Sequence, residues 1–196
     1  MTNESQRLEV LEEAIYSKVL EVIRLLRESN RRIVLAESCT GGLAAAWFTR
    51  IPGVSEVFCG SMVVYRNDTK SNWLGLDPRM LADEKIGPVS SQASEQLARE
   101  VLSRTPEAHV SVGITGHFGP NAPIELNRKI FLVGFIRWDK SGWLKDRFNS
   151  SPIQWIQECN LEMSSLFAKD ISDNRKFMQS LAVFETLCFT IEMLES

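Results

Sequence analysis

The sequence predicts a single α/β domain in which a mixed central β-sheet is flanked by helices. Short apolar runs alternate along the chain with amphipathic segments of helical period. The 196 residues, 44% of them hydrophobic, suit one domain with its own core. No internal repeat, low-complexity tract or flexible linker divides the chain. We therefore expect residues 1–196 to form one domain.

The first elements form a helix followed by a strand–turn–helix unit. Apolar residues recur on one helical face over residues 8–26, which predicts an N-terminal helix within residues 1–30. The continuous apolar run at 33–36 is typical of a strand buried on both faces. Residues 37–42 then form a sharp turn, and the alanine-rich stretch 43–50 predicts a helix.

Three further elements are expected in the middle of the chain. They are a strand at residues 58–65, a short helix at 78–86, and a helix that Ser90 or Ser91 caps and that runs to about residue 103. Lys70 is placed at the far end of the second strand.

The second half contains the rest of the sheet. Alternation at residues 110–114 predicts a strand that ends at Thr115 and Gly116, and a strong strand is expected at 130–138. A further strand is expected at 143–148. The last two are joined too closely for a helical crossover, so we expect the sheet to be mixed. Residues 152–169 fit either a helix or a loop and strand, and Ser172 is expected to cap a final helix.

Composition excludes several classes of function. The net charge is −3 and no basic run of five residues occurs, so there is no electrostatic case for nucleic-acid binding. With His109 and His117 as the two histidines, the widely spaced cysteines predict reduced thiols and no zinc site. The polar start and the lack of an 18-residue apolar run predict a cytoplasmic protein outside the membrane. The cysteines are Cys39, Cys59, Cys159 and Cys188.

The turn at residues 37–42 carries the clearest chemistry. Ser38 lies between a strand and a helix, and Gly41 and Gly42 follow it. Glycines let a ligand approach the backbone closely, and free N–H groups at a helix start can hold an oxyanion or a phosphate. This arrangement resembles a nucleophile elbow, in which a serine lies at a sharp turn between a strand and a helix, although the G-x-S-x-G pattern is missing. The alternative from the residues alone is a plain turn that caps the helix.

A serine nucleophile needs a base. His109 opens a strand, where a structural role is expected, so a Ser-His-Asp arrangement has weak support. Lys70 could act instead if burial lowers its pKa toward 7–8, with Tyr65 relaying a proton or orienting the lysine. The residues alone also fit a solvated surface lysine at this position.

Several ordered motifs resemble one known family. Residues 35–42, Leu-Ala-Glu-Ser-Cys-Thr-Gly-Gly, closely resemble the signature of the CinA C-terminal domain family, the nicotinamide-nucleotide amidohydrolases. The resemblance covers residues 8–138 and the last helix. It continues at Pro52–Ser55, Phe58–Ser61, Tyr65–Lys70, Leu74–Gly75, Gly87–Ser90, Gly113–Gly116, Gly119–Pro120 and Asn174–Arg175.

The resemblance implies an enzyme that converts nicotinamide mononucleotide to nicotinate mononucleotide and ammonia without a metal or cofactor. It places the nucleophile on Ser38, with Tyr65 and Lys70 beside it. From the geometry of the turn, we expect backbone N–H groups around Thr40 to Gly42 to hold the oxyanion. The expected substrate-binding residues are Thr40, Gly41, Gly42, Asn67, Thr115, Gly116 and, as a partner for the 5′-phosphate, Arg175.

Two departures from the family pattern leave alternatives open. His117 and Phe118 replace small residues in the loop at 116–123, which either changes the pocket or turns them into packing. Residues 139–171 align with nothing in the family and are interpreted as an insertion for packing or dimerisation, with Trp143 and Trp155 expected in the core. The alternatives are a hydrolase of another small amide and an inactive nucleotide-binding protein. A homodimer is compatible with the sequence.

Overall fold

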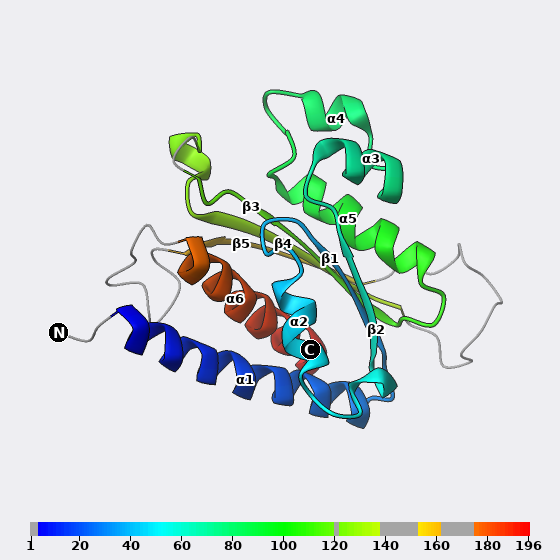
Figure 1. Ribbon diagram of the computed structural model, residues 1–196. Helices are drawn as coiled ribbons and strands as arrows, with labels where there is room; N and C mark the ends of the chain where they lie inside the picture. Colours follow the sequence, from blue (N-terminus) through cyan, green and yellow to red (C-terminus); the bar gives the residue numbers. More distant parts are fainter. Residues whose placement is uncertain (1–3, 120–121, 138–152, 162–174) are drawn as a thin grey trace.

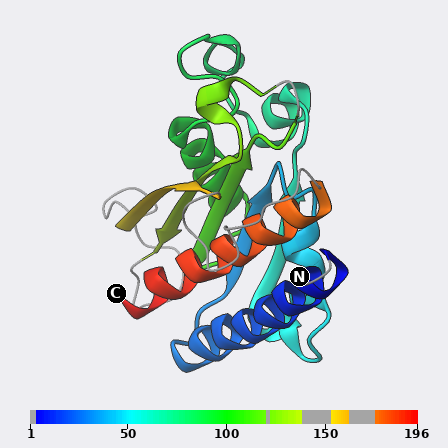
Figure 2. The ribbon, with the colours of Figure 1, turned by 90° about the vertical axis from the view of Figure 1, so that its left-hand side faces the viewer.

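A five-stranded sheet forms the centre of the protein, with strand order β2-β1-β3-β4-β5. The computed structural model describes residues 4–119, 122–137, 153–161 and 175–196. Helices cover both faces of the sheet (Figures 1 and 2). The strands are β1 (Ile33–Glu37), β2 (Phe58–Val63), β3 (Val110–Gly116), β4 (Lys129–Ile136) and β5 (Ile153–Asn160). The predicted α/β fold with a mixed sheet is confirmed.

The topology of the sheet brings three strand ends together. β1 pairs in parallel with β2 and with β3, whereas β3–β4 and β4–β5 are antiparallel. The C-terminal ends of β1, β2 and β3 therefore lie at the same edge. In open α/β sheets this edge is where ligands bind.

The helices form two layers. In Figure 1, α1 (Glu4–Glu28), α2 (Leu43–Thr49) and α6 (Arg175–Glu195) lie on one face of the sheet. The opposite face carries α3 (Asn67–Leu74), α4 (Pro78–Ala82) and α5 (Ser91–Arg104).

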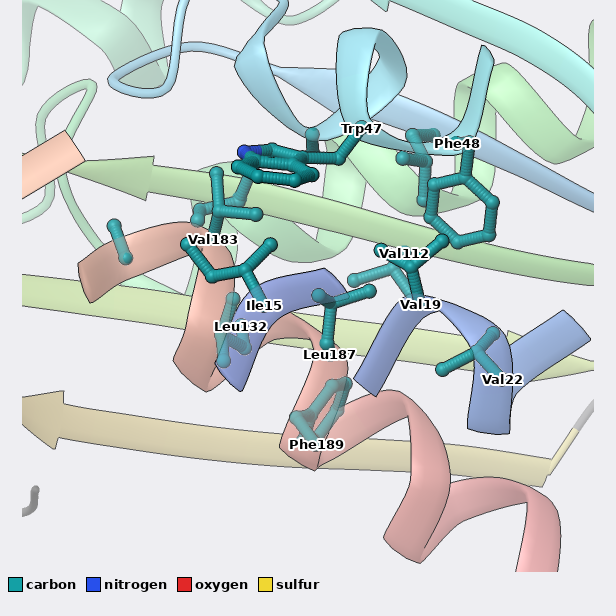
Figure 3. Close-up of a cluster of buried hydrophobic side chains, with 14 of the residues drawn as sticks. Ile15, Val19, Val22, Trp47, Phe48, Val112, Leu132, Val183, Leu187 and Phe189 are labelled. Carbon is teal, nitrogen blue, oxygen red and sulfur yellow. The ribbon is translucent and has the colours of Figure 1, made fainter. Parts of the chain in front are cut away.

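Each layer has its own buried apolar cluster. The larger cluster joins α1, α2 and α6 to the sheet, and Figure 3 shows Trp47, Phe48, Val19 and Leu187 within it. The smaller cluster lies between α5 and the other face of the sheet. Central strands buried on both faces read as continuous apolar runs, as residues 33–36 do.

The final helix is apolar because it belongs to the core. α6 contains an 18-residue window with a mean hydropathy of 1.3, long and apolar enough to span a membrane, and 72% of that window is buried inside the protein. The helix packs along α1 (Figure 2) and over the sheet.

Several predicted boundaries need correction. The strand expected at residues 58–65 ends at Val63, and Lys70 lies in α3, a helix that the sequence pattern did not predict. α3 buries only Lys70 and Leu74, so it has no apolar stripe of helical period. The short helix expected at 78–86 ends at Ala82.

Besides β3, β4 pairs antiparallel with β5, which lies in the stretch that the sequence pattern left open between helix and strand. β5 lies within residues 139–171, so this part of the suspected insertion is a strand of the sheet. Trp155 is half-buried against the larger cluster. The expected strand at 143–148, Trp143 and the cap at Ser172 lie outside the described residues.

Candidate active site

Ser38 leaves the sheet directly after β1 and is 6% exposed. Its backbone N–H donates to the Ile114 carbonyl of β3 at 3.1 Å. The carbonyl of the preceding Glu37 accepts from the Val64 N–H at 2.8 Å. Both neighbouring strands therefore hold the backbone at the nucleophile position. Within the described parts of the chain, the Ser38 hydroxyl makes no hydrogen bond, which leaves it free to react.

The two glycines of the turn have left-handed backbones, with φ of 63° at Gly41 and 96° at Gly42. Glycine adopts this conformation without a steric penalty. The Gly41 N–H donates to the Ser38 carbonyl at 3.1 Å, and the Gly42 N–H donates to the Glu37 carboxylate at 3.0 Å. These two N–H groups, which we expected to hold an oxyanion, are therefore already bonded within the turn.

The N–H groups of Cys39 and Thr40 remain. Neither donates to an acceptor among residues 4–119, 122–137, 153–161 and 175–196. Burial raises the pKa of the Cys39 thiol to about 12. The Thr40 hydroxyl donates to the Glu37 carboxylate at 2.8 Å. The donors available to an anion thus lie one and two residues after Ser38.

Lys70 is a buried lysine, with a relative exposure of 2%. Its Nζ donates to the Tyr65 carbonyl at 2.9 Å. Burial lowers the pKa of Lys70 from 10.5 to about 8, and the nearby Cys39 thiol acts in the opposite direction. The Val64 N–H, one residue before Tyr65, binds the Glu37 carbonyl, so the amine lies beside the strand end that carries Ser38. The solvated surface lysine is excluded. The bond from Nζ goes to Tyr65, not to the Ser38 hydroxyl.

Tyr65 and Arg175 are in contact at the surface beside this region. Tyr65 is 57% exposed, and its phenolic oxygen accepts from Arg175 Nη2 at 2.6 Å. Arg175 Nη1 donates to the Phe118 carbonyl at 3.3 Å. The first residue of α6 therefore links the loop after β2 to the loop after β3.

Gln179 is a contact that sequence reasoning missed. Its Nε2 donates to the Cys39 carbonyl at 3.1 Å, so α6 contacts the turn at residues 37–42 as well. Gln179 lies four residues after Arg175, and residues at this spacing share one helix face. Two long polar residues at that spacing, Arg175 and Gln179, in the first turns of the helix are the signal that could have identified it.

The remaining predicted residues lie around this centre. Thr115 is buried, and its hydroxyl donates to the Pro88 carbonyl at 2.8 Å. A Cβ on Gly116 would lie 2.7 Å from Ile130 Cγ2 and 3.2 Å from Cys39 Sγ, so the end of β3 packs tightly beside the turn. Asn67 is exposed and lines a hollow between α3 and α4 that contains neither Ser38 nor Lys70.

The histidines and Phe118 have structural surroundings. His109 Nδ1 accepts from the Arg32 N–H at 3.1 Å, and burial lowers the pKa of its half-buried ring. Phe118 packs against the larger apolar cluster, and the His117 backbone pairs with Lys129 and Arg128. In the described part of the protein, no three His, Cys, Asp or Glu side chains lie close enough to share a metal ion.

Comparison with known proteins gives the family. The model of the CinA C-terminal domain matches residues 16–133, more than half of the chain. A CinA-like protein of Thermotoga neapolitana is 39% identical over 100 residues, which are 51% of this chain and 24% of the relative. One of Acidobacterium capsulatum is 39% identical over 122 residues, 60% of this chain and 29% of the relative. The chain thus spans about a quarter of the length of these relatives.

Solved structures agree over nearly the whole chain. The competence/damage-inducible protein CihA of Agrobacterium tumefaciens has 26% identity and a TM-score of 0.73, covering 93% of this chain and 96% of that one. The competence damage-inducible protein A of Klebsiella pneumoniae has the same fold at 18% identity, with a TM-score of 0.73 and coverage of 92% and 97%. Together with the turn at residues 37–42 and the buried lysine, these matches show that the chain belongs to the CinA C-terminal domain family.

Proposed function

We propose that this protein is a cytoplasmic amide hydrolase that converts nicotinamide mononucleotide to nicotinate mononucleotide and ammonia. Ser38 is the nucleophile and Lys70 is its base. One observation carries the proposal. A buried lysine with a pKa of about 8 lies beside the strand end that carries Ser38, at the edge where β1, β2 and β3 end.

The lowered pKa supplies the base. A free lysine with a pKa of 10.5 is almost entirely charged at neutral pH, whereas a pKa of about 8 leaves about one amine in ten uncharged at pH 7. This raises the population of the base about 300-fold. An amine held by the Tyr65 carbonyl has to turn toward the Ser38 hydroxyl when substrate binds, and such contacts often tighten only in the complex.

The reaction follows from these positions. Lys70 takes the Ser38 proton as Oγ attacks the carboxamide carbon, and the N–H groups of Cys39 and Thr40 stabilise the oxyanion. The tetrahedral intermediate collapses, the C–N bond breaks, and the proton on Lys70 goes to the departing ammonia. Water then attacks the nicotinoyl ester with Lys70 as its base, and its proton returns to Ser38 as the acid leaves.

Tyr65 and Arg175 suit the outer part of the substrate. Arg175 donates to the phenolic oxygen of Tyr65, so the hydroxyl proton of Tyr65 is available to a substrate or to the leaving group. A guanidinium has five N–H donors. Arg175 can therefore keep its bonds to Tyr65 and Phe118 while other donors bind the 5′-phosphate.

The experiment is an assay of the purified protein with nicotinamide mononucleotide, in which ammonia and nicotinate mononucleotide are both measured. We expect equal amounts of the two products, unchanged by a chelator and lost in Ser38→Ala and Lys70→Ala. Ser55→Ala and Lys85→Ala, at exposed positions, are the matched controls. Full activity in Ser38→Ala contradicts the proposal.

A second substrate class is favoured by one observation. The loop that Arg175 contacts carries His117 and Phe118, where the resemblance expects small residues. Phe118 turns into packing, whereas His117, also half-buried, is a polar side chain in the same loop. Other small amides, including nicotinamide riboside, therefore belong in the same assay. Binding without ammonia release would favour an inactive nucleotide-binding protein instead.

A further inference from the structure

The Glu37 carboxylate is the most heavily bonded side chain of the site, and the mechanism above does not use it. Glu37 is the last residue of β1, precedes Ser38 and is 0% exposed. Its Oε2 accepts from Thr40 Oγ1 at 2.8 Å, Gly42 N at 3.0 Å and Ala44 N at 3.1 Å. Its Oε1 accepts from Ala45 N at 3.0 Å and Ser61 Oγ at 2.9 Å.

These bonds cap a helix from an unusual position. The first N–H groups of a helix have no partner within it, and a side chain just before the helix normally binds them. Gly42 stands before α2 and has no side chain. The carboxylate of Glu37 binds these N–H groups instead, and negative charge is favoured at this end of a helix.

Together with backbone bonds to the neighbouring strands, these bonds fix both ends of the segment that contains the nucleophile. Before it, the Ser38 N–H is bonded to β3 and the Glu37 carbonyl to the chain after β2. After it, the Glu37 side chain holds Gly42 and the start of α2, and Ser61 ties the carboxylate to β2. The residues from Ser38 to Thr40 are therefore held between two anchored ends.

We propose that Glu37 is a positioning residue that sets the place of the Ser38 hydroxyl and of the Cys39 and Thr40 N–H groups. The inference rests on the proposed function, because it assigns Glu37 a role in that nucleophilic reaction. The Glu37 carboxylate binds the N–H groups at the start of α2, so these groups do not bind the substrate's phosphate.

The test replaces an acceptor with a donor. In Glu37→Gln, an NH₂ group faces the Ala45 N–H on one side or the three donors on the other, so at least one bond becomes a repulsion. We expect kcat for nicotinamide mononucleotide to fall roughly 10- to 100-fold, with KM within about twofold of the wild type. Ser61→Ala removes one donor and should cost about fivefold in kcat.

A substrate-independent readout separates this inference from the proposed function. A fluorophosphonate probe phosphonylates a reactive serine: the Ser38 oxygen forms the P–O bond, the P–F bond breaks, and the serine proton goes to the base as fluoride leaves. The labelling rate at Ser38 should fall in Glu37→Gln by the same factor as kcat. If the wild type is labelled at Ser38 but does not hydrolyse the nucleotide, the proposed function fails and the labelling rates still test Glu37.

A stability control separates positioning from folding. Leu26→Ala opens the core beside the start of β1, at the opposite end of that strand from Ser38, and should lower the melting temperature without altering the site. Below their melting temperatures, Leu26→Ala should retain the wild-type labelling rate and Glu37→Gln should not. Equal rates in folded Glu37→Gln and the wild type would overturn the inference, as would a wild type that the probe never labels at Ser38. If Glu37→Gln does not fold, an unchanged labelling rate in Ser61→Ala overturns it.

Discussion

Replacing Lys70 by methionine should stabilise the protein and abolish its activity. Burial lowers the pKa of Lys70 from 10.5 to about 8, a penalty on the charged form of about 3 kcal/mol at pH 7. Methionine keeps the packing of the stem and carries no charge. Loss of the bond to the Tyr65 carbonyl lowers the free energy of unfolding by about 1 kcal/mol. The net gain in the free energy of unfolding is about 2 kcal/mol, or roughly 4–8 °C in melting temperature.

The pH dependence of this gain follows from the same shift. The folded-state pKa of Lys70 is lowered, so between pH 8 and 10.5 the unfolded chain binds more protons than the folded one. The penalty is therefore complete below about pH 8 and disappears as the pH rises through this window. Urea unfolding should show Lys70→Met more stable than the wild type by the full difference at pH 7. Near pH 10.5 the variant should be slightly less stable, because the lost bond to Tyr65 then outweighs what remains of the penalty.

Either of two results would refute this reasoning. Lys70→Met less stable than the wild type at pH 7 would mean that the lysine contributes more through its contacts than it costs through burial. A stability difference independent of pH would mean that the amine has no lowered pKa. Leu74→Met, a buried neutral substitution on the same helix, is the control for changes in packing.

Three further predictions test the site and its frame. With nicotinamide mononucleotide, kcat/KM should rise about tenfold per pH unit up to about pH 8 and level off above it, because the uncharged amine is the active form. A flat profile from pH 6 to 9 would exclude Lys70 as the base. Gln179→Ala removes the bond to the Cys39 carbonyl and should lower kcat about fivefold with KM unchanged, whereas Gln154→Ala on the exposed side of β5 should change neither. Gly116→Ala brings a Cβ within 2.7 Å of Ile130 Cγ2 and should lower the free energy of unfolding in urea by about 1–3 kcal/mol. Gly119→Ala, whose Cβ would have no neighbour closer than 3.5 Å among the described residues, should cost less than half as much.

The strand–turn–helix unit was predictable because its pattern is local. Residues 33–36 are apolar on both faces, and the glycines that follow break the chain at a fixed place. α3 was not predictable in this way, since its residues are mostly polar and its buried face is a lysine and a leucine. The depth of Lys70 depends on where α3 packs, which no local pattern contains.

The contacts of α6 could not be predicted from the sequence for a different reason. Arg175 binds the phenolic oxygen of Tyr65, 110 residues earlier in the chain, and Gln179 binds the carbonyl of Cys39. Neither pair shares a sequence motif, because side-chain contacts between distant elements follow from the packing of α6 over the sheet. The family resemblance identified Arg175 from a short motif, but it did not identify the partner that holds it.

Glu37 and Lys70, both buried at this edge, are surrounded in opposite ways, and the difference accounts for their roles. Glu37 has donors at both oxygens, from the start of α2 and from two hydroxyl groups, so its charge is balanced by bonds that also fix the turn. Lys70 has one acceptor in the described structure, the Tyr65 carbonyl, and its pKa falls to about 8. A fully bonded carboxylate suits an anchor, whereas a sparsely bonded amine can lose its proton and accept another. Giving Lys70 a buried carboxylate partner, as in Cys39→Asp, should therefore raise its pKa and move the rise in kcat/KM to higher pH.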